Sequence, residues 1–435
     1  MMFENVDICV HGDGVVGCVT ALLLSRLNLR VALLKSPIKP TTTAPGFDIR
    51  AYALNSHSKS ILESIKAWPE GDKSTSVNEM YVHADQGEVV QFRGTDLYTG
   101  RRPEPGHSDS DCPPSLTWIV EVGALEQRLD QALKCSKVLV LSASDPSYPQ
   151  LRINDQKLTK TPLSVVCEGY TGEFKKTLLT KTTSTPYYQH ALATRVQVQE
   201  VHRGVAHQWF NHSKTASAAW EAMHGQEGLE IIALLPTGGP HSNTFAVVWS
   251  ASGEKIAKLK TLSDPDFAKA LSSSTRDGFK ELTACGPRQS WPLALSSSSQ
   301  WAGAFNSKAS WVLCGDSAHT VHPLAGMGLN LGLGDAQCLH DFLQERQLHT
   351  SWRPLSDLRL LNAYARERKL AILAPVTFID LIQRLFASDF ALARLIRNNG
   401  FKAFNSFSPL KKWTIAQASS KTSSNSVSFG SDGYA

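Results

Sequence analysis

Long apolar runs, cysteine pairs and internal repeats are all missing from this 435-residue sequence. Its most apolar segment, VVGCVTALLL, ends at Ser25 and Arg26 and falls short of the roughly 20 residues that a transmembrane helix needs. Acidic Glu4 and Asp7 stand where a secretory signal would be basic, so we expect no signal peptide. The eight cysteines show no CxxC motif and no regular spacing, so we expect free thiols in a cytoplasmic protein.

A strong charge of either sign is missing as well. Lys and Arg total 44 against 39 Asp and Glu, which gives a formal net charge of +5. This mild balance argues against nucleic acid as a partner, and it is compatible with an anionic cofactor or an anionic membrane surface. The length exceeds what one hydrophobic core usually serves, so we expect at least two domains.

The order of expected strands and helices indicates an α/β fold interrupted by a second sheet. The strand VDICVHG, a glycine turn, a helix from Val15 and the strand RVALLK form a βαβ unit. Its nearly continuous apolar strands are typical of a parallel sheet buried on both faces. Between residues 187 and 251, four alternating segments predict an antiparallel sheet with one solvated face. WVLCGD then resumes the α/β pattern, and helices follow it.

The stretch HGDGVVG places Gly12, Gly14 and Gly17 in a G-x-G-x-x-G pattern between the first strand and the first helix. These glycines permit a tight turn, close approach of a pyrophosphate and close packing of helix on strand, so the pattern predicts a dinucleotide site. A plain tight turn is the alternative. Lys35 stands where an acidic residue would bind the ribose, and it either donates to a ribose or 2′-phosphate or is simply solvated.

A second glycine-rich stretch follows the strand at residues 311–314. Asp316 comes directly after that strand, and Gly326 to Gly328 leads into another helix. The first turn of such a helix offers N–H donors to a pyrophosphate or to the electron-rich edge of a reduced flavin. Asp316, His319 and His322 are also metal-ligand types, but Pro323 disfavours a helix there and a fourth ligand is not evident, so we expect no metal.

The stretch GDSAHTVHPLAGMGLNLGLGDA closely resembles the second flavin motif of the aromatic-ring flavin monooxygenases, in particular the hydroxylases of ubiquinone biosynthesis. The resemblance implies that Asp316 binds the ribityl chain of FAD and that Pro323 lines the reactive face of the flavin. It implies that Gly326, Gly328 and Asn330 cradle the isoalloxazine. FDIRAYALNSHSKSILESIKAW also resembles a family segment, whose Arg, here Arg50, reaches toward FAD. With the first glycine motif, the residues expected at the cofactor are Gly12, Gly14, Gly17, Lys35, Arg50, Glu168, Gly169, Gly315, Asp316, Pro323, Gly326, Gly328, Leu329 and Asn330.

The sequence departs from the family pattern at several cofactor positions. Lys35 replaces a ribose-binding Glu, and Met327 stands where the family usually has Gln. In VVCEGYTGEFKK, Glu168–Gly169 takes the place of an Asp-Gly pair, Gly172 that of a Ser and Lys175 that of an Arg. The fold implied is a Rossmann-like FAD-binding domain with an inserted, mainly antiparallel substrate sheet and C-terminal helices. The expected boundaries are 1–74, 115–180 and 285–375 for the FAD-binding domain, 75–114 and 181–284 for the substrate-binding domain, 376–420 for the C-terminal helices and 421–435 for a disordered tail.

The resemblance implies a monooxygenase that hydroxylates an aromatic ring, a polyprenylated phenol of ubiquinone biosynthesis, through a flavin hydroperoxide. FAD, O₂ and NAD(P)H or another electron donor are the implied cofactors and co-substrates. His319 and His322 are the nearest candidates for proton transfer, beside Pro323 at the flavin; the alternative is that each imidazole only hydrogen-bonds nearby backbone. Other side chains, on strands of the inserted sheet, could face either a substrate or the core: His190, His207, Gln208 and Trp249.

The apolar substrate implies a membrane-facing or partner-facing surface. Residues 376–412 carry six basic and two acidic residues around an apolar helical stripe, which would dock on an anionic inner membrane or on other quinone-biosynthesis proteins, or would pack on the main domain. Two rival functions stay open: a degenerate scaffold of a quinone-biosynthesis complex that binds FAD poorly, and a flavin oxidase or reductase without ring hydroxylation.

Overall fold

A computed structural model gives the fold. It describes residues 6–35, 49–84, 87–97, 114–142, 161–170, 172–178, 180–212, 229–279, 281–321 and 327–387. Within these ranges no helix is long and apolar enough to cross a membrane. The cysteines in these ranges are free thiols.

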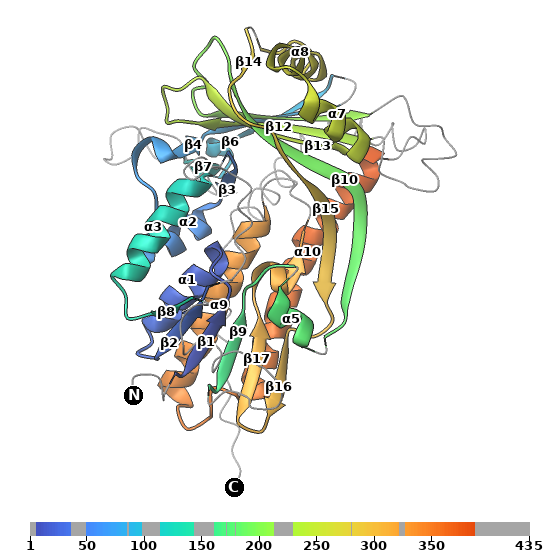
Figure 1. The fold of residues 1–435 in the computed structure, drawn as a ribbon. Coiled ribbons are helices and arrows are strands. Elements are labelled where there is room, and N and C mark those ends of the chain that lie inside the picture. The colour runs from blue at the N-terminus through green and yellow to red at the C-terminus, as the bar shows by residue number, and fades with distance from the viewer. Residues whose placement is uncertain are drawn as a thin grey trace.

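The first layer is a six-stranded sheet in the order β16-β17-β9-β1-β2-β8 (Figure 1). All neighbours pair in parallel except β16 with β17. Every residue of β1, β2, β9 and β17 is buried, as the continuous apolar strands of the sequence require. The strands are β1 (Ile8–His11), β2 (Val31–Leu34), β8 (Leu139–Leu141), β9 (Leu163–Val166), β16 (Ala302–Asn306) and β17 (Ala309–Leu313).

Helices pack against this sheet and against one another. The helix α1 contacts both α3 and α9, while α10 contacts α9 and β16. In Figure 1, α9 and α10 extend from the parallel sheet toward the second, larger sheet. The helices of this part are α1 (Val15–Ser25), α2 (Ser56–Ser64), α3 (Val122–Lys134), α5 (Glu173–Thr177), α9 (Met327–His349) and α10 (Leu358–Ala387). A small sheet of β3 (Ala51–Leu54), β7 (Thr117–Glu121) and β4 (Ser74–Val77) lies beside them, and the 3-10 turns are η1 (Gly71–Lys73), η2 (Gly94–Leu97) and η3 (Gly315–Ser317).

The second layer is a nine-stranded sheet, antiparallel except where β11 meets β5. Its strands are β5 (Glu79–His83), β6 (Val89–Arg93), β10 (Thr182–Gln197), β11 (Val205–His212), β12 (Leu229–Thr237), β13 (Thr244–Ser252), β14 (Thr283–Ala284), β15 (Gln289–Ser298) and β18 (His319–Thr320). The predicted fold class, a parallel α/β layer with an inserted antiparallel sheet and C-terminal helices, is therefore confirmed. The residue boundaries expected for the two domains stay predictions.

One feature of the second sheet was predicted wrongly. The face expected to be solvated is covered by α7 (Gly253–Thr261) and α8 (Asp264–Ser274), which lie on its far side from the parallel sheet (Figure 1). Trp249 and Phe267 are fully buried in the cluster between this outer face and the two helices. The opposite, inner face looks toward the parallel layer, and Met327, the first residue of α9, packs against it.

Candidate cofactor site

The first glycine turn has the backbone geometry that the motif predicts. Gly12 has φ +102°, a region that favours glycine, and a Cβ there would lie 2.7 Å from the carbonyl oxygen of Cys167. A Cβ on Gly17 would lie 1.9 Å from the carbonyl oxygen of Gly12, so only glycine lets α1 pack this closely on the turn. At Gly14 the outcome is different, because a Cβ would meet nothing within 4 Å.

The open space at Gly14 lies at the start of α1. Gly14 is the N-cap of this helix, no side chain among the described residues caps it, and its first turn holds no acidic residue. The first N–H groups of α1 are thus available to an anion, with the positive end of the helix dipole behind them. A dinucleotide pyrophosphate fits this position.

The second glycine motif lies beside the first one in space, although about 300 residues separate them in the sequence. Gly315, the first residue of η3, has φ +62°, and a Cβ on it would lie 3.1 Å from Cγ1 of Val16. A Cβ on Gly332, in α9, would lie 2.8 Å from Cγ2 of the same Val16. The first turn of α1, the η3 turn and the first part of α9 therefore converge, which is the arrangement that a cofactor bound by both motifs requires.

Asp316 lies at the centre of this convergence. Its side chain is exposed, yet burial by the surrounding protein raises its pKa, and nearby Asp335 raises the pKa further while Lys175 lowers it. The carboxylate thus has much protein around it while solvent still reaches it. Its free oxygens can accept hydrogen bonds from the hydroxyl groups of a ribityl chain.

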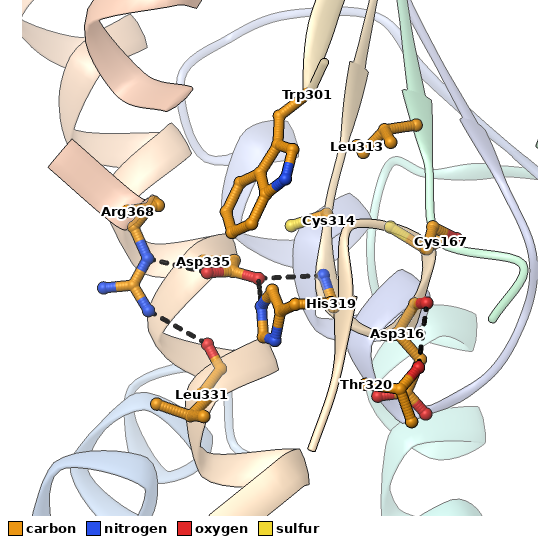
Figure 2. Close-up of polar contacts among 12 residues, drawn as sticks. Cys167, Trp301, Leu313, Cys314, Asp316, His319, Thr320, Leu331, Asp335 and Arg368 are labelled. Carbon is orange, nitrogen blue, oxygen red and sulfur yellow. Dashed lines mark hydrogen bonds and ion pairs between the residues drawn. The ribbon is translucent and has the colours of Figure 1, made fainter. Parts of the chain in front are cut away.

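A buried ion-pair network holds the η3 turn in place (Figure 2). Asp335 of α9 is fully buried, and its Oδ2 accepts hydrogen bonds from Gly315 N at 2.9 Å and from His319 Nε2 at 2.7 Å. Its Oδ1 accepts from Arg368 Nε of α10 at 2.6 Å. Arg368 also donates to the carbonyl oxygen of Leu331 at 3.2 Å. One carboxylate therefore joins the cofactor turn, α9 and α10.

The electrostatics of this network favour the charged pair. Burial raises the pKa of Asp335, but His319 and Arg368 outweigh that effect and hold the pKa below its ordinary value. Burial lowers the pKa of Arg368, and Asp335 outweighs it in the same way, so that pKa is raised. Both groups are charged at neutral pH.

His319 is only 4% exposed and stacks on Trp301, with ring centroids 5.2 Å apart (Figure 2). Its Nε2 contacts Asp335, and its Nδ1 has no hydrogen-bond partner in the described part of the chain. Of the two roles expected for this imidazole, the contact is closer to a hydrogen bond within the protein, but the partner is a carboxylate and not backbone. His322, Pro323 and Gly326 lie outside the described residues.

Asn330 ties α9 to a segment that is distant in the sequence. Its Oδ1 accepts from Asn55 N at 3.0 Å and from Ser58 Oγ at 2.7 Å, and its Nδ2 donates to the carbonyl oxygen of Ala53 at 2.8 Å. These bonds tie the start of α9 to the junction of β3 and α2. The Asn330 side chain therefore fixes the start of α9 against this neighbouring segment, and its expected contact with the flavin ring stays a prediction. Nearby, a Cβ on Gly328 would lie 3.8 Å from Cγ2 of Val321, and Leu329 packs against the main core.

The altered Asp-Gly motif also contributes structure. The Glu168 carboxylate accepts from Phe174 N at 2.7 Å, at the start of α5, and its side chain fills the space where a Cβ on Gly172 would lie. Gly169 and Ser317 hydrogen-bond each other twice, Gly169 N donating to Ser317 Oγ at 3.1 Å and the hydroxyl donating back to the Gly169 carbonyl at 3.2 Å. The motif is thus joined directly to the turn that carries Asp316.

The positive side chains expected at the cofactor lie at three separate places. Lys35 follows the last residue of β2 beside the Gly12 turn, and its backbone N–H donates to the Leu141 carbonyl at 2.8 Å. Lys175 is buried, and burial lowers its pKa while Asp316 raises it. Arg50 is exposed just before β3, and its carbonyl accepts from Arg195 of the second sheet at 3.4 Å.

Sequence reasoning missed Asp335, Arg368 and Ser317. Asp335 carried a detectable signal, because it is a charged residue within the small and apolar run GLGDA, where a buried carboxylate needs a partner. Nothing local marks Arg368 as that partner, since the two residues are 33 positions apart.

Comparison with known proteins identifies the family of this chain. Residues 5–378 match the family model described as FAD binding domain, and the chain belongs to this family of FAD-binding monooxygenases. It is 23% identical over 421 residues to the ubiquinone hydroxylase UbiL of Rhodospirillum rubrum, covering 95% of this chain and 89% of that protein. It is 28% identical over 474 residues to the mitochondrial ubiquinone biosynthesis monooxygenase COQ6 of Xenopus tropicalis, covering 95% and 93%. Among solved structures, p-nitrophenol 4-monooxygenase PnpA from Pseudomonas putida DLL-E4 matches with a TM-score of 0.63 at 13% identity, covering 96% of this chain and 99% of that one, which supports the fold.

Proposed function

We propose that this monooxygenase hydroxylates the aromatic ring of a polyprenylated phenol in ubiquinone biosynthesis. The observation that carries the proposal is the convergence of the open α1 N-terminus, the Asp316 turn and the first part of α9 around Val16. Relatives named as ubiquinone hydroxylases match along nearly the whole chain and support the choice of substrate.

Each part of the site has a distinct task toward FAD. The first turn of α1 would bind the pyrophosphate, Asp316 the ribityl hydroxyls, and backbone at the start of α9 the pyrimidine edge of the ring. The bound FAD would supply the redox chemistry with O₂, using electrons from NAD(P)H or another donor. The network of Asp335, His319 and Arg368 would hold Asp316 in position, and His319 is in this proposal a positioning residue.

Titration of the purified protein with FAD, followed by visible absorption, tests the cofactor. We expect Asp316→Ala to lose flavin and activity together, because it removes the acceptor for the ribityl hydroxyls. Full FAD occupancy and normal turnover in this variant would contradict the assignment. A wild-type protein that ignores FAD, in a host that still needs the chain for quinone synthesis, would favour the scaffold.

Incubation with ¹⁸O₂, NAD(P)H and a prenylated phenol, followed by mass spectrometry, tests the reaction. One ¹⁸O atom in the ring of the product supports hydroxylation. Consumption of NAD(P)H without oxygen in the phenol would identify an oxidase or reductase instead.

We also propose that α10 contacts an anionic membrane, from which an apolar substrate would enter. Leu370 and Leu373 are 71% and 61% exposed, and with Arg366 and Thr377 they follow one exposed face of the helix. Lys369 beside them adds a second exposed positive charge, so this face is complementary to anionic lipid. The apolar stripe expected from Phe378 to Phe386 lies in side chains outside those described.

Co-sedimentation with vesicles tests this surface. We expect binding to vesicles that contain phosphatidylserine and weaker binding to purely zwitterionic ones. Leu370→Glu combined with Leu373→Glu should abolish it, whereas Leu348→Glu, at the 69% exposed end of α9, should not. Equal binding by both variants would refute the α10 surface.

A further inference from the structure

The strand β11 presents different side chains to the two faces of the large sheet. Successive side chains of a strand point to opposite faces. Trp209 packs in the outer cluster with Trp249 and the helices α7 and α8, so His207 lies on that outer face as well. Phe210 packs in the inner cluster with Met327, the first residue of α9, and Gln208 therefore lies on the inner face.

Gln208 is a buried amide in apolar surroundings. It is only 4% exposed, and its neighbours across β5 and β12 are Val82 and Ala233. The same row continues over β13 and β10 through Val248 and Ala193. Gln208 is thus the polar side chain of a row that is otherwise apolar from β5 to β10.

Within the described ranges this amide makes no hydrogen bond, and its nitrogen and oxygen are not among the fully enclosed polar atoms there, so a small molecule can reach them. Gln189, on β10 of the same sheet, is also buried, but its Nε2 donates to the carbonyl oxygen of Leu229 at 2.9 Å. An accessible amide in an otherwise apolar row can serve as the polar contact that orients a ligand in an apolar site.

The position of Gln208 is suited to a substrate ring. Phe210, two residues along the strand and roughly 7 Å away, contacts Met327 at the start of α9. That helix start is where the proposed function places the flavin ring. A small aromatic molecule held against the inner face near Met327 would therefore be within reach of the Gln208 amide.

We infer that Gln208 binds the hydroxyl group of the phenol substrate and so fixes which part of the ring faces the cofactor. The inference rests on the proposed function and names one contact within it. An amide both donates and accepts, so it suits a phenol as well as a phenolate. The apolar cluster of Val82, Ala84, Phe210, Leu229 and Ile231 beside it would receive the hydrocarbon part of the substrate.

Two matched variants test the inference, Gln208→Leu and Gln189→Leu. Each replaces a buried amide of the second sheet by an apolar group of similar size. We expect Gln208→Leu to retain or increase the stability of the ligand-free protein and to keep full FAD content. Gln189→Leu should lower the stability, because it leaves the Leu229 carbonyl without its donor.

Binding of two probes to the FAD-loaded protein then measures recognition, through the change in flavin absorption. The probes are a para-prenylated phenol and the same prenylated benzene without the hydroxyl. Wild-type protein should prefer the phenol by about tenfold to a hundredfold, and Gln208→Leu should lose the preference. In turnover the variant should show a raised KM for the phenol.

Three results would overturn the inference. Gln208→Leu could keep the wild-type preference for the phenol, or it could lose as much stability as Gln189→Leu. The third result is a wild-type protein that binds neither probe. Wild-type protein that prefers the phenol but does not hydroxylate it would refute the proposed function and leave the role of Gln208 supported. The two failures are therefore distinguishable.

Discussion

Arg368→Met should be among the most damaging single substitutions in the described part of the chain. The substitution removes the guanidinium that donates to Asp335 Oδ1 at 2.6 Å and keeps most of the side-chain volume. Asp335 is 0% exposed, so its carboxylate would stay buried with only His319 and Gly315 N as partners. Removing one partner of a buried ion pair costs about 3–5 kcal/mol, and we expect a loss of unfolding free energy in that range.

The loss should depend on pH in a defined direction. In the folded wild-type protein the pKa of Asp335 is lowered. Its contribution to stability is therefore present above the pKa of about 3.9 that a carboxylate has in the unfolded chain, and it is lost as the pH falls through the lower pKa of the folded protein. Without Arg368, burial dominates and should raise the folded pKa above the unfolded one. The deficit of the variant should then be largest at neutral pH and should shrink as the pH falls toward the raised pKa.

Urea unfolding followed by tryptophan fluorescence, at pH 7.5 and pH 5, measures both effects, since Trp301 stacks on His319 of the network. Arg366→Met is the matched control, because Arg366 is exposed on the same helix and its loss should change stability by less than about 0.5 kcal/mol. A deficit for Arg368→Met no larger than that of the control, or one that grows toward acid pH, would refute the reasoning.

Other substitutions test separate parts of the structure. Gly17→Ala should prevent correct folding, because its Cβ would lie 1.9 Å from a backbone oxygen. Gly14→Ala should fold normally and bind FAD more weakly. Equal expression and equal circular dichroism spectra of the two variants would contradict this. Asn330→Ala should lower the unfolding free energy by about 1–3 kcal/mol, because it removes the partner of Asn55 N, Ser58 Oγ and the Ala53 carbonyl. Urea unfolding measures this change, and an unchanged midpoint would show that these bonds contribute nothing. Burial, with a smaller effect of nearby positive charge, lowers the pKa of His83 and of His207 to about 4, below the ordinary 6.5. Since the unfolded chain then binds more protons than the folded protein, the free energy of unfolding should decrease as the pH falls from about 6.5 toward 4. His207→Phe should reduce that acid loss of melting temperature, and an identical pH profile would argue against this origin.

Local patterns in the sequence were sufficient for the parts of the site that depend on backbone. Gly12 and Gly17 stand in a motif whose spacing relates directly to a turn and a close helix contact, and the structure shows both. Asp316 was predicted at a strand end, and it lies there. The expected contact of Asn330 with the flavin ring stays a prediction. Its bonds to protein backbone and Ser58 could not be predicted, because the target of a side chain depends on which distant segment packs beside it.

The solvated face of the second sheet was predicted wrongly although the sequence held evidence for its covering helices. Ser252 caps α7 by accepting from Lys255 N, and Ser263 caps α8 by accepting from Asp266 N, with a proline in the first turn of α8. These are recognisable helix-start signals. Strand alternation, by contrast, separates Gln208 from His207 but does not say which of them faces a site, since that depends on what packs on each face.

Met327 shows why a departure from a family pattern needs the tertiary structure before it can be interpreted. The sequence placed it on the flavin side, where the family usually has Gln. In the structure it packs against the inner cluster of the second sheet, beside the buried side chains Phe210, Leu229 and Ile231. A Gln amide pressed on that cluster would be left without partners from it, at a cost of about 1–3 kcal/mol. The methionine therefore matches the apolar sheet that it touches, and the polar contact to a substrate is left to Gln208 on the same face.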